Sequence, residues 1–301
     1  GLFVSRPGAT RQTIQLIVGS LQWETMMLLA RGAQDAGRRR GIHLQLYDAG
    51  GDFELDLDFL RRLPDTRADG AIIGSLHNRR FAEVLFELKT RGFPFVLVDE
   101  LPEYLDVPAV GTDNYDAGAR IGREIVRLGH RRIGFLGDLV APTTRARLDG
   151  LRDAMADGGL VFDRALVVDL KEDENRLGDW SDRVRHCARE LLGRADRPTA
   201  VFCSCDAVAA QVYPVCRDLG LRVPVDVSLV GFDGWSMCEV LDPPLATMRQ
   251  PMREMGEAAL EMLLGQLQQP RAGAARRTLA SEWVSRASLG PCPPAEGKNH
   301  P

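Results

Sequence analysis

Short apolar runs alternate with helix-like segments through the first half of the chain. The apolar runs predict strands over Thr13–Gly19, His43–Tyr47, Gly70–Gly74 and Phe95–Asp99. Between them, helices are predicted to end at Arg40, Leu63 and Arg91. No tandem hairpin interrupts this alternation, so the pattern predicts a parallel, doubly wound α/β sheet.

The second half repeats the pattern and predicts a second sheet of the same kind. Val110–Asp113 is expected to cross into it, and Pro244 is expected to begin the return crossing. The predicted strands are Ile133–Leu136, Ala165–Asp169, Ala200–Cys203, Val227–Gly231 and a last one over Leu279–Val284. The predicted helices are Tyr115–Leu128, Arg147–Asp157, Trp180–Leu192, Asp206 to about Gly220, and Met252–Leu267.

Two strands of this half stop at a carboxylate, Asp206 after one and Asp233 after the other. In open parallel sheets, ligands bind beyond the carboxyl ends of the strands, so both residues are candidates for a binding site. Each also has a simpler explanation. Asp206 would serve as a helix N-cap, and Asp233 would form a turn with Gly234.

Composition narrows the class of protein. A chain of 301 residues accommodates two α/β lobes, and a formal net charge of −4 argues against a broad basic face that grips nucleic acid. No apolar run is long enough to span a membrane. The six cysteines form no CxxC pair and have no histidine at ligand spacing, which predicts free thiols in a reducing cytoplasm and no metal site.

Four separated blocks of the sequence resemble the lactose/galactose-repressor family of bacterial transcription regulators. They are VGTDNYDAGARIGREIVRLGHRRIGFLG, PTAVFCSCDAVAA, GLRVPVDVSLVGFDG and DPPLATMRQPMREMGEAA, in that order. The resemblance implies an effector-binding domain built like a type I sugar-binding periplasmic protein: two doubly wound parallel lobes joined by crossover strands, with a ligand cleft between them. It also implies a homodimer formed through the first lobe.

The resemblance assigns the parts of the chain to lobes. The N-terminal lobe is expected to comprise 13–112 and 246–270, and the C-terminal lobe 113–245 and 278–288. Residues 289–301 are rich in proline and predict a disordered tail. Residues 1–12 are expected to be a linker, whose GLFVS fragment resembles the end of a gluconate-repressor-type winged helix. Operator DNA would then be bound by an N-terminal head outside this chain, of either the gluconate-repressor or the lactose-repressor type.

Several positions match effector contacts of the family. Arg147, in the run RLDG, matches an arginine whose planar guanidinium suits sugar hydroxyls or a carboxylate. Asp233 and Asp206 match acidic contacts, since a carboxylate accepts two hydroxyl hydrogen bonds. Asp99 matches a further contact on the first lobe. Cys205 stands where relatives carry asparagine, which indicates that the effector differs from theirs.

Three of the four tryptophans, Trp23, Trp180 and Trp235, lie near loops predicted to face the cleft: Trp23 and Trp235 in loops at strand ends, and Trp180 at the start of a helix. Trp180, in GDWS, resembles a position that places an aromatic ring under a sugar in the lactose-repressor branch. An indole face matches the apolar face of a pyranose, so the three predict an aromatic box. Tryptophans also commonly belong to the core, which is the alternative here.

The leading hypothesis is therefore a ligand-sensing domain of a transcription regulator, with a sugar or sugar derivative as effector; purines and amino acids are alternatives. A sugar-binding protein of a transport system shares this architecture. An enzyme is disfavoured because the sequence lacks dinucleotide, phosphate-loop and nucleophile-elbow motifs. No cofactor is predicted.

Overall fold

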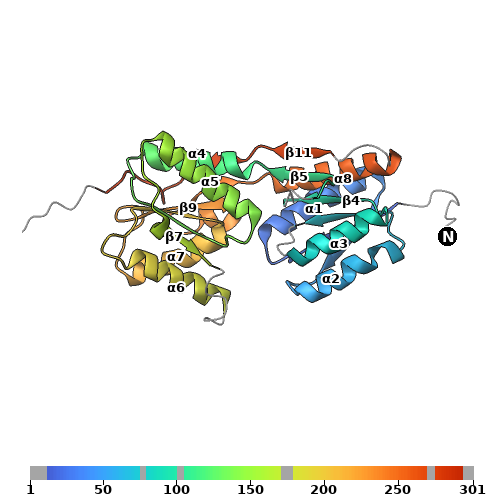
Figure 1. The fold of residues 1–301 in the computed structure, drawn as a ribbon, viewed down its shortest axis with the longest axis horizontal. Helices are drawn as coiled ribbons and strands as arrows, with labels where there is room; N and C mark the ends of the chain where they lie inside the picture. The colour runs from blue at the N-terminus through green and yellow to red at the C-terminus, as the bar shows by residue number, and fades with distance from the viewer. Residues whose placement is uncertain (1–11, 75–78, 100–104, 171–178, 270–274, 294–301) are drawn as a thin grey trace, which may run out of the picture. The chain divides into compact units, whose positions relative to one another are not determined.

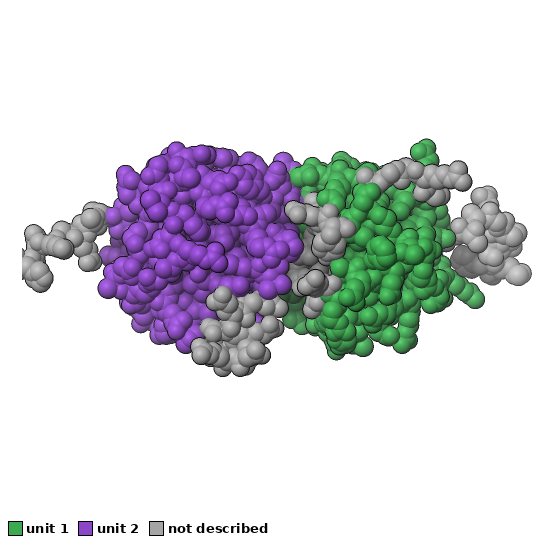
Figure 2. Space-filling view, viewed as in Figure 1, with its two compact units in different colours: residues 1–111, 252–279 green, residues 112–251, 280–301 purple. Residues whose placement is uncertain are grey.

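The computed structural model describes residues 12–74, 79–99, 105–170, 179–269 and 275–293. The chain forms two compact units, coloured separately in Figure 2. Unit 1 runs to Gly111 and includes Met252–Leu279, whereas unit 2 comprises Thr112–Pro251 and the residues from Ala280 onward. The chain therefore passes between the units three times.

Unit 1 is built on a six-stranded sheet with the order β11-β5-β4-β3-β1-β2 (Figure 1). Strands β1 to β5 pair with one another in parallel. The strands are β1 (Thr13–Val18), β2 (His43–Asp48), β3 (Gly70–Gly74), β4 (Phe95–Val98), β5 (Ala109–Thr112) and β11 (Arg276–Leu279). The helices are α1 (Glu24–Arg40), α2 (Phe53–Arg62), α3 (Arg79–Thr90) and α8 (Met252–Gln268).

Helices cover both faces of the central strands of this sheet, which explains why β1, β3 and β4 are apolar and buried along almost their whole length. Successive residues of a strand point to opposite faces. Ile14, Leu16 and Val18 of β1 pack with α1 and α8, whereas Ile17 packs with α2 and α3. The predicted doubly wound α/β architecture is confirmed for this unit.

Unit 2 has a second six-stranded sheet, with the order β12-β10-β9-β8-β6-β7. Only β12 is antiparallel to its neighbour. The strands are β6 (Ile133–Gly137), β7 (Val167–Asp169), β8 (Ala200–Cys203), β9 (Ser228–Asp233), β10 (Ala246–Arg249) and β12 (Glu282–Val284). The helices are α4 (Asn114–Arg127), α5 (Pro142–Asp157), α6 (Trp180–Leu192) and α7 (Asp206–Asp218), with α4 and α5 against one core cluster and α6 and α7 against the other.

Glycines allow the paired helices to pack unusually closely. A Cβ built on Gly118 of α4 would lie 2.1 Å from the carbonyl oxygen of Arg147 in α5, and one on Gly150 would lie 2.1 Å from that of Tyr115. In unit 1, a Cβ on Gly32 of α1 would lie 1.9 Å from the carbonyl oxygen of Arg253 in α8. No residue with a side chain fits at these crossings without moving a helix.

The structure corrects two expectations about the last third of the chain. Residues 246–251 were expected in the N-terminal lobe, yet β10 pairs with β9 inside unit 2. The single strand expected over Leu279–Val284 is two strands, β11 in unit 1 and β12 in unit 2. The chain changes unit at Leu279/Ala280, so the apolar run does not stay in one sheet.

The expectation of a disordered tail over 289–301 is contradicted for its first five residues. Residues 294–301 lie outside the described residues, as do 1–11 at the other end. Leu289–Pro293 are described and are bonded to unit 2: the Cys292 N–H donates to the Leu128 carbonyl at 2.9 Å, and Gly290 accepts from His130 at 3.0 Å. Backbone pairing outweighs the proline-rich composition of this segment.

Candidate functional site

The parallel strands of unit 2 bring several sequence-predicted residues to one edge of the sheet. In register, Leu136 of β6 lies beside Cys203 of β8, and Asp233 of β9 lies beside Arg249 of β10. The carboxyl ends of these strands therefore share one edge. The residues that follow them, Cys205 and Asp206 after β8 and Gln250 after β10, lie at this carboxyl edge together with Asp233.

Arg147 enters this edge from α5. The helix begins at Pro142, because proline is well suited to a first helical position, so Arg147 lies in the second turn rather than at the predicted helix start. Its side chain is only 5% exposed. Nε donates to Asn114 Oδ1 at 2.8 Å, Nη1 donates to the Ser204 carbonyl at 2.6 Å, and the guanidinium lies 3.5 Å from the Phe232 ring centroid.

These contacts fix the guanidinium in one plane, with its charge over an aromatic face. Among the described residues, no acceptor bonds the second amino group, Nη2. The neighbouring Arg145 is different: it is exposed, and its Nη1 caps the carbonyl groups of Leu139 and Val140. Of the two arginines, Arg147 is the one preorganised as a donor at the strand ends.

Asp206 occupies a position different from the one predicted. Cys205 is the N-cap of α7, and Asp206 is the first helical residue, with no exposed surface. Its Oδ2 accepts from the Gly234 and Trp235 amides at 2.7 and 2.8 Å, and Oδ1 accepts from the Thr247 hydroxyl at 2.7 Å. Burial raises the pKa of this carboxyl, while the bond from Thr247 and the loop amides lowers it.

The expected direct contact between Asp206 and an effector therefore conflicts with the structure. All three of these donors belong to the protein, and no part of the Asp206 side chain is exposed to solvent. What it does is join α7 and β10 to the loop after β9. A Cβ on Gly231 would lie 2.1 Å from Asp206 Oδ1, so strand β9 also packs directly on the carboxylate.

Asp233 is the last residue of β9 and directly precedes that loop. Its φ of 113° lies in a region that non-glycine residues rarely adopt, which is a form of strain found at functional sites. The side chain is half-buried, and Oδ1 accepts from Gln250 Nε2 at 2.9 Å. Asp99, at the end of β4 in unit 1, shows the same kind of backbone, with a φ of 75°. The two units thus each present a strained aspartate at a strand end.

Gln250 is a site residue that the sequence reasoning missed. Its backbone N–H donates to the Asp233 carbonyl at 3.0 Å, in addition to the side-chain bond. The rule that singled out Asp206 and Asp233, a polar residue directly after a strand, applies equally to Gln250. It was overlooked because Ala246–Arg249 was not recognised as a strand of this sheet.

Cys205 lies between the charged groups of this edge. Burial raises the pKa of its thiol to about 12, and the Asp233 carboxylate contributes in the same direction, whereas Arg147 opposes it. The thiol is therefore protonated at neutral pH and is a weak donor rather than a nucleophile. Among the described residues, no three His, Cys, Asp or Glu side chains are grouped so that they could hold a metal ion.

The three tryptophans do not share one environment. Trp180 and Trp235 are half-buried and pack against the same hydrophobic core cluster of unit 2. Trp235 also donates its backbone N–H to Asp206. Trp23 precedes α1 in unit 1 and is 40% exposed. The structure thus brings two of the three into one unit, and the aromatic box stays a prediction.

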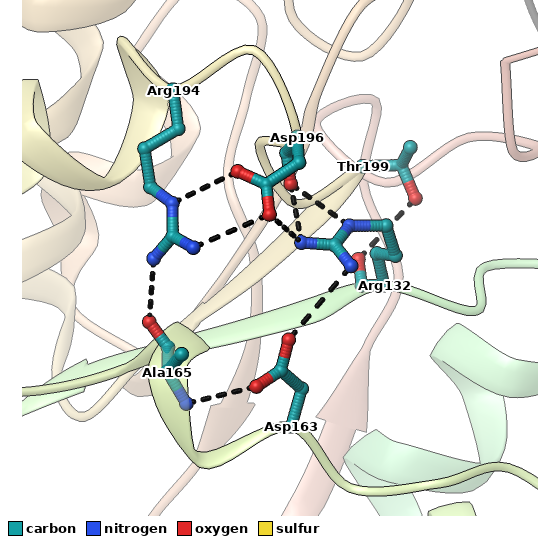
Figure 3. Close-up of polar contacts among 6 residues, drawn as sticks. All are labelled: Arg132, Asp163, Ala165, Arg194, Asp196 and Thr199. Carbon is teal, nitrogen blue, oxygen red and sulfur yellow. Dashed lines mark hydrogen bonds and ion pairs between the residues drawn. The ribbon is translucent and has the colours of Figure 1, made fainter.

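A dense polar cluster at the opposite edge of the unit 2 sheet is a competing candidate (Figure 3). Arg132 bonds Asp196 and lies 3.8 Å from Asp163, while Arg194 bonds Asp196 and the Ala165 carbonyl. Each of its four charged side chains is paired within the cluster. We interpret it as an ion-pair network that ties together the loops before β6, β7 and β8.

Comparison with known proteins places this chain in a family. Residues 123–289 match the model of the "Periplasmic binding protein-like domain". The HTH-type transcriptional repressor PurR of Photobacterium profundum is 28% identical over 260 residues, covering 85% of this chain and 74% of that protein. None of the described helices combines the length and apolar character that a membrane-spanning helix needs.

Solved structures of transcriptional regulators share this fold. A complex of the transcriptional regulator CelR with cellobiose matches with a TM-score of 0.80 and 27% identity, over 93% of this chain and 85% of that one. A regulator of the LacI family from Enterococcus faecium with bound ribose matches with a TM-score of 0.77 and 26% identity, over 93% and 99%. These relatives are transcriptional regulators rather than enzymes, as the sequence predicted. The chain belongs to the periplasmic binding protein-like domain family and is an effector-binding domain of the lactose/galactose-repressor type.

Proposed function

We propose that this chain senses a small polar effector, a sugar or sugar derivative, at the carboxyl edge of the unit 2 sheet. The observation that carries the proposal is the pairing of a buried, preorganised donor with a strained acceptor: Arg147, fixed over Phe232, and Asp233, with its φ of 113°. A guanidinium and a carboxylate together match the donors and acceptors of vicinal hydroxyl groups. The bound cellobiose and ribose of two similar structures support a sugar in particular.

In this proposal Asp99, Trp23, Trp180, Trp235 and Cys205 are secondary contacts. The protonated Cys205 thiol adds a weak donor where relatives would have a stronger one, so the effector is expected to differ from theirs. Ligand occupancy would alter the affinity of a fused DNA-binding head for its operator, which requires unequal ligand affinity for the two functional states. A homodimer would match a two-fold operator.

A thermal-shift screen against mono- and disaccharides, sugar phosphates, purines and amino acids tests the proposal. A ligand present at 100 times its dissociation constant should add about 2.7 kcal/mol of stability. Arg147→Lys retains the charge but loses the planar fork, and Asp233→Asn loses the charged acceptor. Both should abolish most of the shift, whereas Arg145→Lys, at an exposed neighbour, should retain it.

A ligand whose shift survives both site substitutions would place binding elsewhere in the chain. Stabilisation by purines or amino acids alone would keep the site and overturn the sugar assignment.

A further inference from the structure

The helices of unit 1 carry opposite charges at their two ends. Acidic residues lie in the first turns of α1 and α2, whereas basic residues lie in the last turns of α1, α2 and α3. The basic residues are Arg38, Arg39, Arg40, Arg61, Arg62 and Lys89. The helix dipole favours cations at a C-terminal end, so each helix taken alone needs no further explanation.

The topology of unit 1 gathers these basic ends at one edge of the sheet. Thr13 of β1 pairs with His43 of β2, and Ile14 pairs with Gly70 of β3, so the parallel strands begin at a common edge. Helices α1, α2 and α3 each end shortly before one of the strands β2, β3 and β4 begins. Their last turns therefore lie together at this edge, which we call the amino edge of unit 1. The negative net charge of the whole chain conceals this separation.

Several of these cations are paired with nearby carboxylates. Arg39 bonds Glu257 of α8 at 3.1 Å, and Arg62 bonds Asp58 at 2.8 Å. Both arginine side chains are more than half exposed, at 56% and 71%. Exposed ion pairs of this kind are weak, so they reduce the positive charge of the edge without fixing it in place.

Arg61 and Arg67 differ from these paired arginines. Both are exposed, and among the described residues no ion pair holds either guanidinium. Arg67 also lies outside the helices, between the short 3₁₀ turn Leu63–Asp65 and β3, so stabilisation of a helix end does not account for it. The two arginines are free to bind an anion from outside unit 1.

Arg67 lies close to the point where the chain enters unit 1. The Thr13 N–H donates to Asp69 Oδ2 at 2.7 Å, and the Asp69 N–H donates to the Thr13 carbonyl at 2.8 Å. Any domain joined ahead of β1 is therefore attached at the amino edge. In the proposed function that domain is a DNA-binding head, which brings a polyanion to the same edge.

We infer that the amino edge of unit 1 binds the phosphate backbone of duplex DNA through Arg61 and Arg67, independently of base sequence. A duplex presents one negative charge per about 1.7 Å of its axis, and the planar arginine fork matches phosphate oxygens. The inference rests on the proposed function as a regulator, because it gives the effector-sensing domain its own contact with the DNA that the head binds.

Fluorescence anisotropy of a short labelled duplex, titrated with the full chain, tests the inference without any contribution from a head. Affinity should fall about tenfold between about 50 and 200 mM salt, as expected for two phosphate contacts. Arg61→Gln combined with Arg67→Gln should weaken binding about tenfold or more at the lower salt concentration and remove this salt dependence. Duplexes of unrelated sequence should bind equally well.

Arg131→Gln combined with Arg164→Gln is the matched control. Both arginines are exposed, have no ion pair among the described residues, and lie just ahead of β6 and β7 in unit 2. This variant should keep the affinity and the salt dependence of wild type. Arg61→Glu combined with Arg67→Glu is a second test, in which repulsion replaces attraction and binding should become weaker than in the glutamine variant.

Two results would overturn the inference. If wild type does not bind the duplex at low salt, the paired carboxylates neutralise the amino edge. If both glutamine variants lose affinity equally, the attraction comes from the chain as a whole rather than from this edge. Neither result affects the proposed effector site, because the thermal-shift screen reports on Arg147 and Asp233 in unit 2.

Discussion

The aspartates after β8 and β9 have the same chemistry and opposite roles. Asp206 has no exposed surface and accepts from two loop amides and a hydroxyl, whereas Asp233 is half-buried and held by Gln250. The first carboxylate therefore acts on the second indirectly. It fixes Gly234 and Trp235, which directly follow Asp233, and so maintains the strained backbone from which the Asp233 side chain projects.

Replacing Asp206 by asparagine should destabilise unit 2 by about 2–4 kcal/mol, because an amide group would face donors that now bond a carboxylate oxygen. Urea denaturation measures this loss. Asp149→Asn, which removes an exposed ion pair with Arg152, should change stability by less than about 1 kcal/mol. If the two variants were equally stable, the hydrogen bonds at Asp206 would contribute little.

This division of roles could not be predicted from the sequence. Arg147 and Asp233 were identified from residue type and family resemblance, and the structure brings both to one edge. The partners of Asp206 are 28 to 41 residues away in the chain, and no local pattern shows that they converge on it. Gln250 has an ordinary polar side chain, and only the pairing of β10 with β9 reveals its position.

At the scale of helices, α4 and α5 form the frame that holds Arg147. Gly118 and Gly150 let the two helices approach until backbone touches backbone, and Asn114, at the start of α4, accepts from Arg147 Nε. The spacing between these helices therefore sets where the guanidinium lies. Sequence periodicity predicted both helices, yet it placed the start of α5 five residues late because it took Pro142 for part of a loop.

Gly118→Ala should separate α4 from α5, since the added methyl group would lie 2.1 Å from the Arg147 carbonyl oxygen. Overpacking of this kind costs about 1–3 kcal/mol of stability. Because the displaced helix carries Arg147, binding of any ligand that contacts this arginine should also become weaker. Gly265→Ala in α8 is the control, because its Cβ would meet nothing within 4 Å and helix propensity favours alanine.

Thermal unfolding and calorimetric titration of both glycine variants test whether the spacing of α4 and α5 positions Arg147. Gly118→Ala should lose stability and affinity together, and Gly265→Ala should gain about 0.5–1 kcal/mol of stability with affinity unchanged. If Gly118→Ala changed neither the stability nor the ligand affinity, α4 and α5 would be able to separate without displacing Arg147.

In the whole molecule, each unit has its own sheet and its own pair of hydrophobic clusters. Each unit also buries a different titratable group, so we expect the stability of the two units to depend differently on pH. Unit 1 buries Asp56, at 3% exposure and with Oδ1 unpartnered among the described residues, and burial raises the pKa of this carboxyl to about 6. Unit 2 buries His130, whose ring bonds Thr199 and Gly290, and burial lowers its pKa.

The two shifts have opposite consequences for stability. A carboxyl whose folded pKa is raised stabilises the fold at low pH, and this contribution is lost as pH rises from about 4 through about 6. A histidine whose folded pKa is lowered stabilises the fold above its unfolded pKa near 6.5, and this contribution is lost as pH falls below that value. Unit 1 should therefore weaken toward alkaline pH and unit 2 toward acid.

Hydrogen exchange with mass spectrometry resolves the units separately, once rates are corrected for the intrinsic effect of pH. Between pH 5 and pH 8, protection of β1 and β3 should fall with rising pH, while protection of β6 and β8 should rise. Asp56→Asn should stabilise unit 1 by about 2 kcal/mol at pH 8. His130→Gln should reduce the loss of stability that unit 2 shows as pH falls, without changing unit 1. His186→Gln, at an exposed histidine of α6, should leave both profiles in place. If the strands of both units lose protection in parallel at every pH, the units unfold as one cooperative body, and neither buried group acts on its own unit alone.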